Sequence, residues 1–175
     1  MKNSTFAMEF RSFDAFIERY KALRSSLAQD SQITTQLSKL GNQYRQVFDQ
    51  IDPLIQDLTT KSCPYCGVVC CAQKFGLPNS NDLVAFLAMN VNGHIYDFQK
   101  DPSSMCQFMG ERGCILPRYQ RPFRCTFYFC DPLLIQIDLL PADEHQTLVK
   151  GLKKLESLRQ EMAKIAGLGP MSVTK

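Results

Sequence analysis

Apolar side chains recur at alternating steps of three and four residues in the first third of the chain, the period of an amphipathic helix. One run covers residues 6–27, and a second run covers residues 33–58 without a miss. Between them, Gln29-Asp30-Ser31 is a polar break whose side chains can cap a second helix. A short link between two long helices predicts an antiparallel helical hairpin over residues 1–62.

The two apolar stripes are predicted to be core, and their spacing also resembles that of a coiled-coil seam. The first consists of Phe6, Phe10, Phe13, Ile17, Tyr20 and Leu27, widened by Phe16 and Leu23, and the second of Ile33, Leu37, Leu40, Tyr44, Val47, Ile51, Leu54 and Leu58. Such a hairpin can bind a protein partner or a second copy of the chain. Asp52-Pro53 interrupts the second stripe, and we expect a kink there because proline cannot donate the helical hydrogen bond.

Two further helices are expected along the chain. Residues 82–89 predict a short helix, and a long one starts near Pro141, where acidic residues in the first turn favour a helix N-terminus. Gly167, Gly169 and Pro170 end that long helix. Polar and apolar residues alternate over 94–98, which predicts a short strand.

The chain is therefore expected to be mainly α and to form one compact unit of three segments. These are the helical hairpin over 1–62, a cysteine-rich region of short helices and loops over 63–140, and a C-terminal helix over 141–170 that packs on the rest. A net charge of +3 is too small to predict nucleic-acid binding. No apolar run long enough to span a membrane and no signal-peptide pattern is present, so the expected location is the cytoplasm.

The eight cysteines are confined to one part of the chain. All lie between residues 63 and 130, as a first block of Cys63, Cys66, Cys70 and Cys71 and a second block of Cys106, Cys114, Cys125 and Cys130. In a reducing cytosol, clustered cysteines more often bind metal than form disulfides. A Cys-x-x-Cys turn such as Cys63–Cys66 lets two sulfurs converge on one ion.

The identity of the metal stays open at this level. Eight thiols can form two closed four-thiolate zinc sites, and four can also hold an iron–sulfur cluster beside a separate site. The tight first block favours iron–sulfur, and the even division into two sets of four favours zinc. A redox dithiol at Cys63–Cys66 is the alternative, against which the adjacent pair Cys70-Cys71 argues.

The cysteine pattern resembles the zinc- or iron-chelating cysteine-cluster family (CxxCxxCC, YkgJ-like), to which a domain of the flagellin lysine-N-methylases is related. Besides the eight cysteines, Phe108 and Arg121-Pro122 before Cys125 carry the resemblance, which covers about residues 63–130. Three residues, not two, separate Cys66 from Cys70. The resemblance implies a bacterial, intracellular metal-binding domain.

Four arginines, Arg112, Arg118, Arg121 and Arg124, fall within 13 residues of the second block. We expect them to neutralise the clustered thiolates and to donate hydrogen bonds to sulfur, Arg121 and Arg124 above all. The alternative is an anionic ligand, because guanidinium groups suit carboxylate and phosphate.

A non-catalytic role is the favoured function, in which metal ties together a loop-rich segment and the hairpin binds a partner. A cluster-dependent enzyme, such as a protein lysine N-methyltransferase, is one alternative and rests on family analogy. A thiol-based redox or metal sensor is another.

Overall fold

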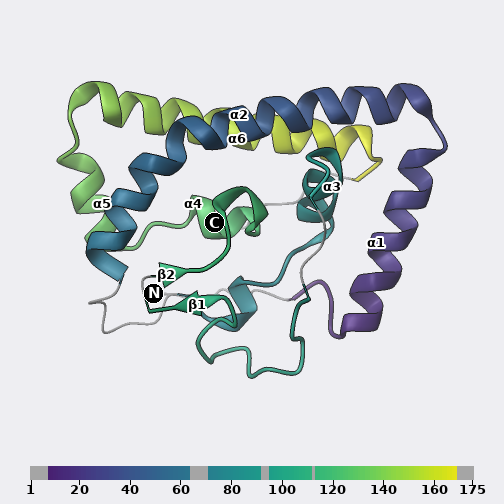
Figure 1. Ribbon diagram of the computed structural model, residues 1–175, viewed down its shortest axis with the longest axis horizontal. Helices are drawn as coiled ribbons and strands as arrows, with labels where there is room; N and C mark the ends of the chain where they lie inside the picture. Colours follow the sequence, from purple (N-terminus) through teal and green to yellow (C-terminus); the bar gives the residue numbers. More distant parts are fainter. Residues whose placement is uncertain (1–7, 64–70, 92–94, 112, 169–175) are drawn as a thin grey trace.

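The computed structural model describes residues 8–63, 71–91, 95–111 and 113–168, and the protein is mainly α as predicted (Figure 1). The elements in chain order are α1 (Phe13–Ala28), α2 (Ser31–Ser62), the 3-10 turn η2 (Gln73–Phe75), α3 (Ser80–Ala88), β1 (Met109–Gly110), β2 (Gly113–Cys114), the 3-10 turn η3 (Arg118–Gln120), α4 (Phe123–Phe127), α5 (Asp131–Asp138) and α6 (Ala142–Ile165). None of the described helices is both long and apolar enough to cross a membrane.

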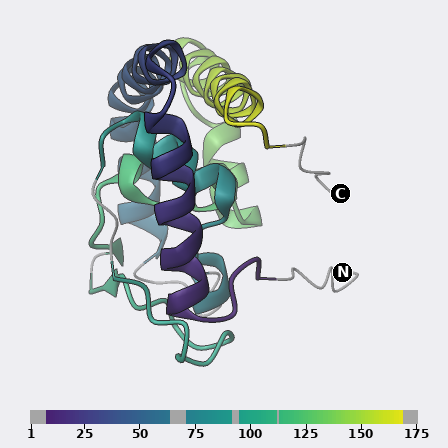
Figure 2. The same cartoon turned by 90° about the vertical axis from the view of Figure 1, so that its right-hand side faces the viewer.

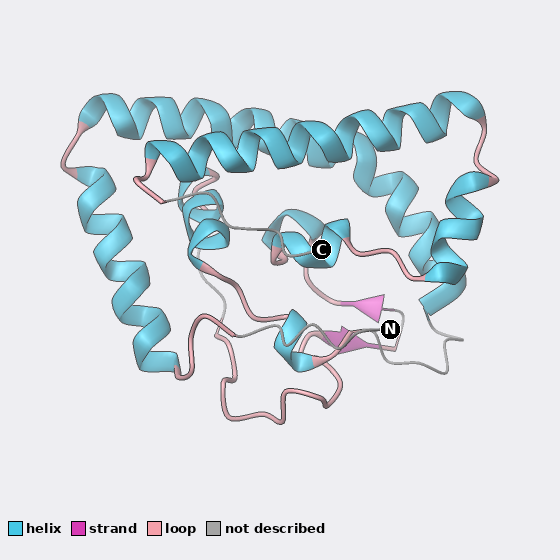
Figure 3. Ribbon diagram, turned by 180° about the vertical axis from the view of Figure 1, so that it is seen from behind, coloured by secondary structure: helices cyan, strands magenta, loops and turns pink. Residues whose placement is uncertain are grey.

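Helices α2 and α6 lie side by side and form the largest layer of the fold (Figures 1 and 3). The predicted stripes of both helices are largely buried, with Ile51, Leu148 and Leu155 fully so. The helices approach closely at Gly151, where an added Cβ would come within 2.3 Å of Ile51 Cγ2. The seam of α2 is thus covered within the chain. One hydrophobic cluster joins residues of all three predicted segments.

The N-terminal helix pair is present, but α1 does not lie along α2. Figure 2 shows α1 descending from the end of α2 at a steep angle. The aromatic side of α1 packs instead against the loop after α3, where the Phe16 ring lies 5.3 Å from Tyr96 and 5.7 Å from Phe98. Phe13, predicted as core, is 39% exposed. Helices α1 and α2 thus form an open pair, not the closely packed antiparallel hairpin that was expected. Helices α6 and α3 cover α2 instead.

Helix α2 continues through Pro53, although Figure 1 shows that it bends along its length. The proline removes one internal hydrogen bond, which accounts for a bend without a break. Its N-terminus is capped as predicted: the Asp30 carboxylate accepts hydrogen bonds from the backbone N–H groups of Gln32 and Ile33. The predicted strand over 94–98 is absent from its described part, 95–98, and His94 lies outside the described residues.

Helix α3 begins two residues before the predicted start and is held by a capping box between Asn79 and Asp82. Asp82 is buried, and its Oδ1 also accepts a hydrogen bond from the backbone N–H of Phe123 in α4 and pairs with Arg159 Nη2 of α6 at 3.4 Å. These contacts fix α4, which carries Cys125, against α3 and α6. Helix α6 ends at Ile165, two residues before Gly167, whose φ is +71°, in agreement with the predicted glycine end.

Candidate metal centre

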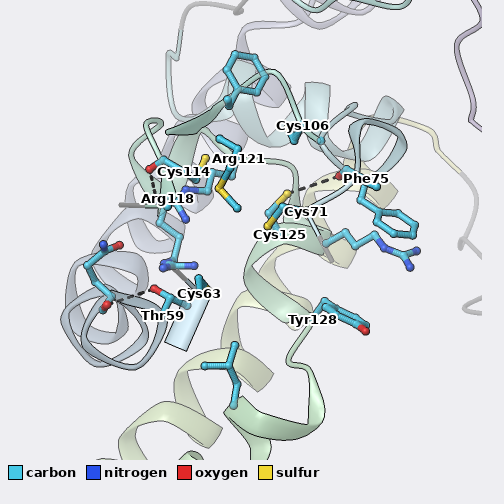
Figure 4. Close-up of a pocket in the computed structure, with 18 residues that line it drawn as sticks. Thr59, Cys63, Cys71, Phe75, Cys106, Cys114, Arg118, Arg121, Cys125 and Tyr128 are labelled. Atoms are coloured by element: carbon cyan, nitrogen blue, oxygen red, sulfur yellow. Dashed lines mark hydrogen bonds between the residues drawn. The ribbon is translucent and has the colours of Figure 1, made fainter. Parts of the chain in front are cut away.

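A cavity of about 190 Å³ lies between the C-terminal end of α2 and the loops of the cysteine-rich segment (Figure 4). Cysteines from both sequence blocks line it: Cys63, Cys71, Cys106, Cys114 and Cys125. The described cysteines therefore gather at one place irrespective of their block. Cys66 and Cys70 lie outside the described residues, so their predicted ligation stays a prediction.

Backbone hydrogen bonds join the two blocks directly. The N–H of Cys106 donates to the carbonyl of Cys71 at 2.8 Å, beside an antiparallel bridge between Ala72 and Met105. The buried Gln73 adds side-chain bonds: its Nε2 donates to Gln107 Oε1, and its Oε1 accepts from the Gln107 N–H at 2.8 Å. Cys71 and Cys106 are therefore neighbours through main-chain geometry that needs no metal.

Gly76 is the small residue that this arrangement requires. A Cβ at Gly76 would lie 2.4 Å from the sulfur of Cys106, well inside van der Waals contact. The glycine follows η2, whose turn brings the Phe75 carbonyl toward the cavity, where it accepts a hydrogen bond from Cys125 Sγ at 3.6 Å. A side chain at position 76 would displace the Cys106 thiol.

The other cavity cysteines sit on short elements. Cys114 pairs with Met109 in the two-residue antiparallel ladder of β1 and β2. Cys125 lies in α4, which starts after the rigid Arg121-Pro122 step. Cys130 is different: it occupies the N-cap position of α5, is half-buried and does not line the cavity. Helix α5 was not predicted, although Pro132 near its start is a typical helix signal.

Burial disfavours the thiolate forms of Cys106 and Cys125. Desolvation, followed by the neighbouring Cys114 and Cys106, raises the pKa of Cys125 from 9.0 to about 12. Burial also raises the pKa of Cys106. A buried thiolate needs a nearby positive charge, because an uncompensated charge in a poorly solvated site is costly. A metal ion supplies such a charge when it replaces the thiol protons.

Arg121 and Arg124 both line the cavity, and each makes a contact that orients its guanidinium. Arg121 Nε donates to the Leu116 carbonyl at 2.8 Å, and its Nη2 lies 3.5 Å from the Cys114 carbonyl. Arg124 stacks on Phe75, with Cζ 4.1 Å from the ring centroid, and burial lowers the pKa of its guanidinium. Arg121 thus holds the loop that carries Cys114, while its charge stays beside the thiols.

The sequence does not distinguish Arg118 from the three other arginines near it, but the structure does. It is 1% exposed, and its Nε donates to Asp52 Oδ1 on α2 at 2.6 Å. Desolvation and the nearby Arg121 lower the pKa of Arg118, while the Asp52 pairing opposes that shift. The pair joins η3 to α2 beside the cavity. Asp52, which directly precedes Pro53 in α2, is thus part of an ion pair across two elements.

In the described ranges, no three side chains of the Cys, His, Asp and Glu types converge closely enough to hold a metal ion as they stand. The five cavity cysteines surround the space without meeting at one point. Comparison of the chain with models of known protein families, with curated proteins and with solved structures gave no match.

Proposed function

We propose that this chain is a metal-binding protein whose clustered cysteines hold an iron–sulfur cluster or zinc in the cavity at the end of α2. The observation that carries the proposal is the gathering of five cysteines from both blocks around one cavity. Cys66 and Cys70 belong to the proposed donor set by their place in the first block, and Cys130 by its place in the second. Thiolates are the ligands that both zinc and iron–sulfur clusters take in proteins.

The size of the cavity favours a centre larger than one ion. A tetrahedral zinc sits about 2.3 Å from each sulfur and leaves no further space between its ligands. The cavity, at about 190 Å³, is much larger than the space that one ion takes between its ligands. An iron–sulfur cluster fits such a space better than a single zinc. Two zinc sites are the second candidate, because eight thiols divide into two sets of four.

The role we propose for the metal is structural. The cysteine-rich segment around the cavity is built from short elements, namely two-residue strands, three-residue turns and the five-residue α4. A metal bound by Cys63 on α2, Cys71 beside η2 and Cys125 on α4 would cross-link these pieces. Rotation about χ1 can redirect each sulfur without a backbone change.

The remaining parts of the proposal follow from this role. A reducing compartment such as the cytoplasm keeps the thiols available for metal. The resemblance to the zinc- or iron-chelating cysteine-cluster family supports the proposal, since the five cavity cysteines are among the eight that it assigns to metal. A cluster-dependent methyltransferase and a redox sensor are the competing functions, and they differ from the structural role in needing substrate binding or reactive thiols.

Anaerobic purification, followed by metal analysis and an absorption spectrum, tests the proposal. Iron with labile sulfide and a broad absorption band near ~400 nm would support a cluster. Colourless protein with two zinc ions per chain would support the zinc candidate. A folded, metal-free protein in which reagent titrates all eight thiols would refute both. Binding of S-adenosylmethionine in calorimetry, or reversible zinc release by dilute peroxide, would favour the methyltransferase or the sensor.

A further inference from the structure

The cavity contains a buried cation with unused hydrogen-bonding capacity. Arg118 uses its Nε for Asp52, but none of the described residues accepts a hydrogen bond from its buried Nη2. A buried donor without an acceptor costs about 1–3 kcal/mol, so such groups in folded proteins generally contact water or a ligand. Because Arg118 lines the cavity, a ligand in the cavity is well placed to accept this bond.

The lining is electropositive and two-sided. Its described residues include Arg118, Arg121 and Arg124, and none of those described is an aspartate or glutamate. Figure 4 shows Arg118, Thr59 and Cys63 on one side, with Cys71 and Cys125 on the other. Apolar groups complete the wall, namely Ala72, Phe75, Phe108, Met109 and Leu133.

We infer that the Arg118 side of the cavity binds the carboxylate of a small organic molecule whose apolar part faces the remaining wall. A carboxylate is favoured because the two Nη atoms of a guanidinium match its two oxygens, and because one negative charge suits an arginine already paired with Asp52. A carboxylic acid also carries an apolar part that the remaining wall can contact, which inorganic phosphate lacks.

The cavity volume limits the ligand to a few non-hydrogen atoms. The metal of the proposed function shares the cavity, so only the part beside Arg118 is open to the ligand, which suits a short-chain acid. The inference deepens the proposed function and rests on it for one point: the metal is taken to lie toward Cys71 and Cys125, with Cys63 reaching it from the Arg118 side, so the acid lies next to the metal. The hydrogen bond from Arg118 does not itself require the metal.

The test compares n-butyrate with butyramide, which has the same shape but no charge, by calorimetric titration into the metal-loaded protein. We expect butyrate to bind. Butyramide should bind at least about ten-fold more weakly, which is the effect of losing one charge-assisted hydrogen bond. Inorganic phosphate is titrated in parallel. Absent butyrate binding, or binding of phosphate in preference to butyrate, would overturn the inference.

Two variants locate the site, and a third is the control. Arg118→Gln removes the donor, and Thr59→Asp adds a competing carboxylate on the same side while Arg118 is retained; both should abolish butyrate binding. Arg45→Gln, whose native guanidinium stacks on Tyr119 outside the cavity, should bind butyrate like the wild type. Undiminished binding in Thr59→Asp would contradict the proposal even if Arg118→Gln did not fold.

Metal analysis of the same samples separates the two proposals. Wild-type protein that holds metal but binds no butyrate would overturn the carboxylate site and leave the metal centre standing. Protein that binds butyrate through Arg118 but holds no metal would overturn the metal centre and leave the carboxylate site standing. Loss of metal in Arg118→Gln without any butyrate binding to the wild type would mean that Arg118 serves the metal alone, which also overturns the inference.

Discussion

Arg118 Nε and Asp52 Oδ1 lie 2.6 Å apart and join η3 to α2. Arg118 is fully buried and the Asp52 side chain is 37% exposed, so removing the carboxylate strands a buried cation. We expect Asp52→Ala to lower the free energy of unfolding by about 2–3 kcal/mol, less than for a fully buried pair. Chemical denaturation measures it.

The matched control is Asp57→Ala, which removes an exposed pair with Lys61 from the same helix and should cost less than about 1 kcal/mol. Equal losses for the two variants would mean that the buried Arg118 pair stabilises the fold no more than the exposed pair does.

The two cysteines that flank the end of α4 should differ in metal binding. Cys125 lines the cavity and Cys130 does not. Both belong to the proposed donor set, but we expect Cys125→Ala to reduce bound metal by at least half and Cys130→Ala, whose residue lies outside the cavity lining, to reduce it less, as measured by metal analysis after anaerobic purification. A larger loss in Cys130→Ala would favour grouping by sequence block, with Cys130 in a second site.

Rising pH should have opposite effects on the metal-free fold and on metal binding: it should lower the free energy of unfolding and raise the metal affinity. In the metal-free protein, the unfolded Cys125 loses its proton near pH 9.0 while the folded residue keeps it to about 12. The unfolded state then binds fewer protons, so the free energy of unfolding falls across this window, by at most about 1.4 kcal/mol per pH unit for each such thiol. Metal affinity rises with pH instead, because binding releases thiol protons.

Urea denaturation of the metal-free, reduced protein between pH 8 and 10 measures this slope. Cys125→Ala removes the thiol and should make the slope shallower. An unchanged slope would show that other groups carry the dependence.

Gly76→Ala should uncouple metal binding from folding. The new Cβ would displace the sulfur of Cys106, which can rotate away at modest cost to stability. We expect weaker metal retention against a chelator, with a far-ultraviolet spectrum like that of the wild type. Gly41→Ala is the contrasting variant, because its Cβ would meet the Ala88 carbonyl oxygen, at 2.1 Å, and should destabilise the fold itself. Wild-type metal retention in Gly76→Ala would contradict the placement of Cys106 at the centre.

The helices were predictable where a periodic stripe is long and caps are present. The stripe of α2, its Asp30 cap and the glycine end of α6 were all read from the sequence. The partner of α2 was not, because the stripe fixes which face is buried but not which helix covers it. The short link favoured α1 as the helix that covers α2. In the structure, Phe16 of α1 packs against Tyr96 and Phe98.

The candidate site was predictable in its residue types and not in its grouping. Spacing within each block suggested two sets of four, but the contact between Cys71 and Cys106 depends on long-range backbone pairing that no local pattern encodes. Arg118 was one of four similar arginines, and only its burial against Asp52 distinguishes it.

The hydrogen bond between Cys106 N–H and the Cys71 carbonyl closes a long loop that contains α3. Bringing the ends of such a loop together costs several multiples of RT in chain entropy, and the cost grows only slowly with loop length. In this protein, folding of the backbone already includes that entropy cost before any metal binds. The two thiols are then presented at a high effective concentration to each other, so a metal ion would gain from the second sulfur with little further ordering of the chain.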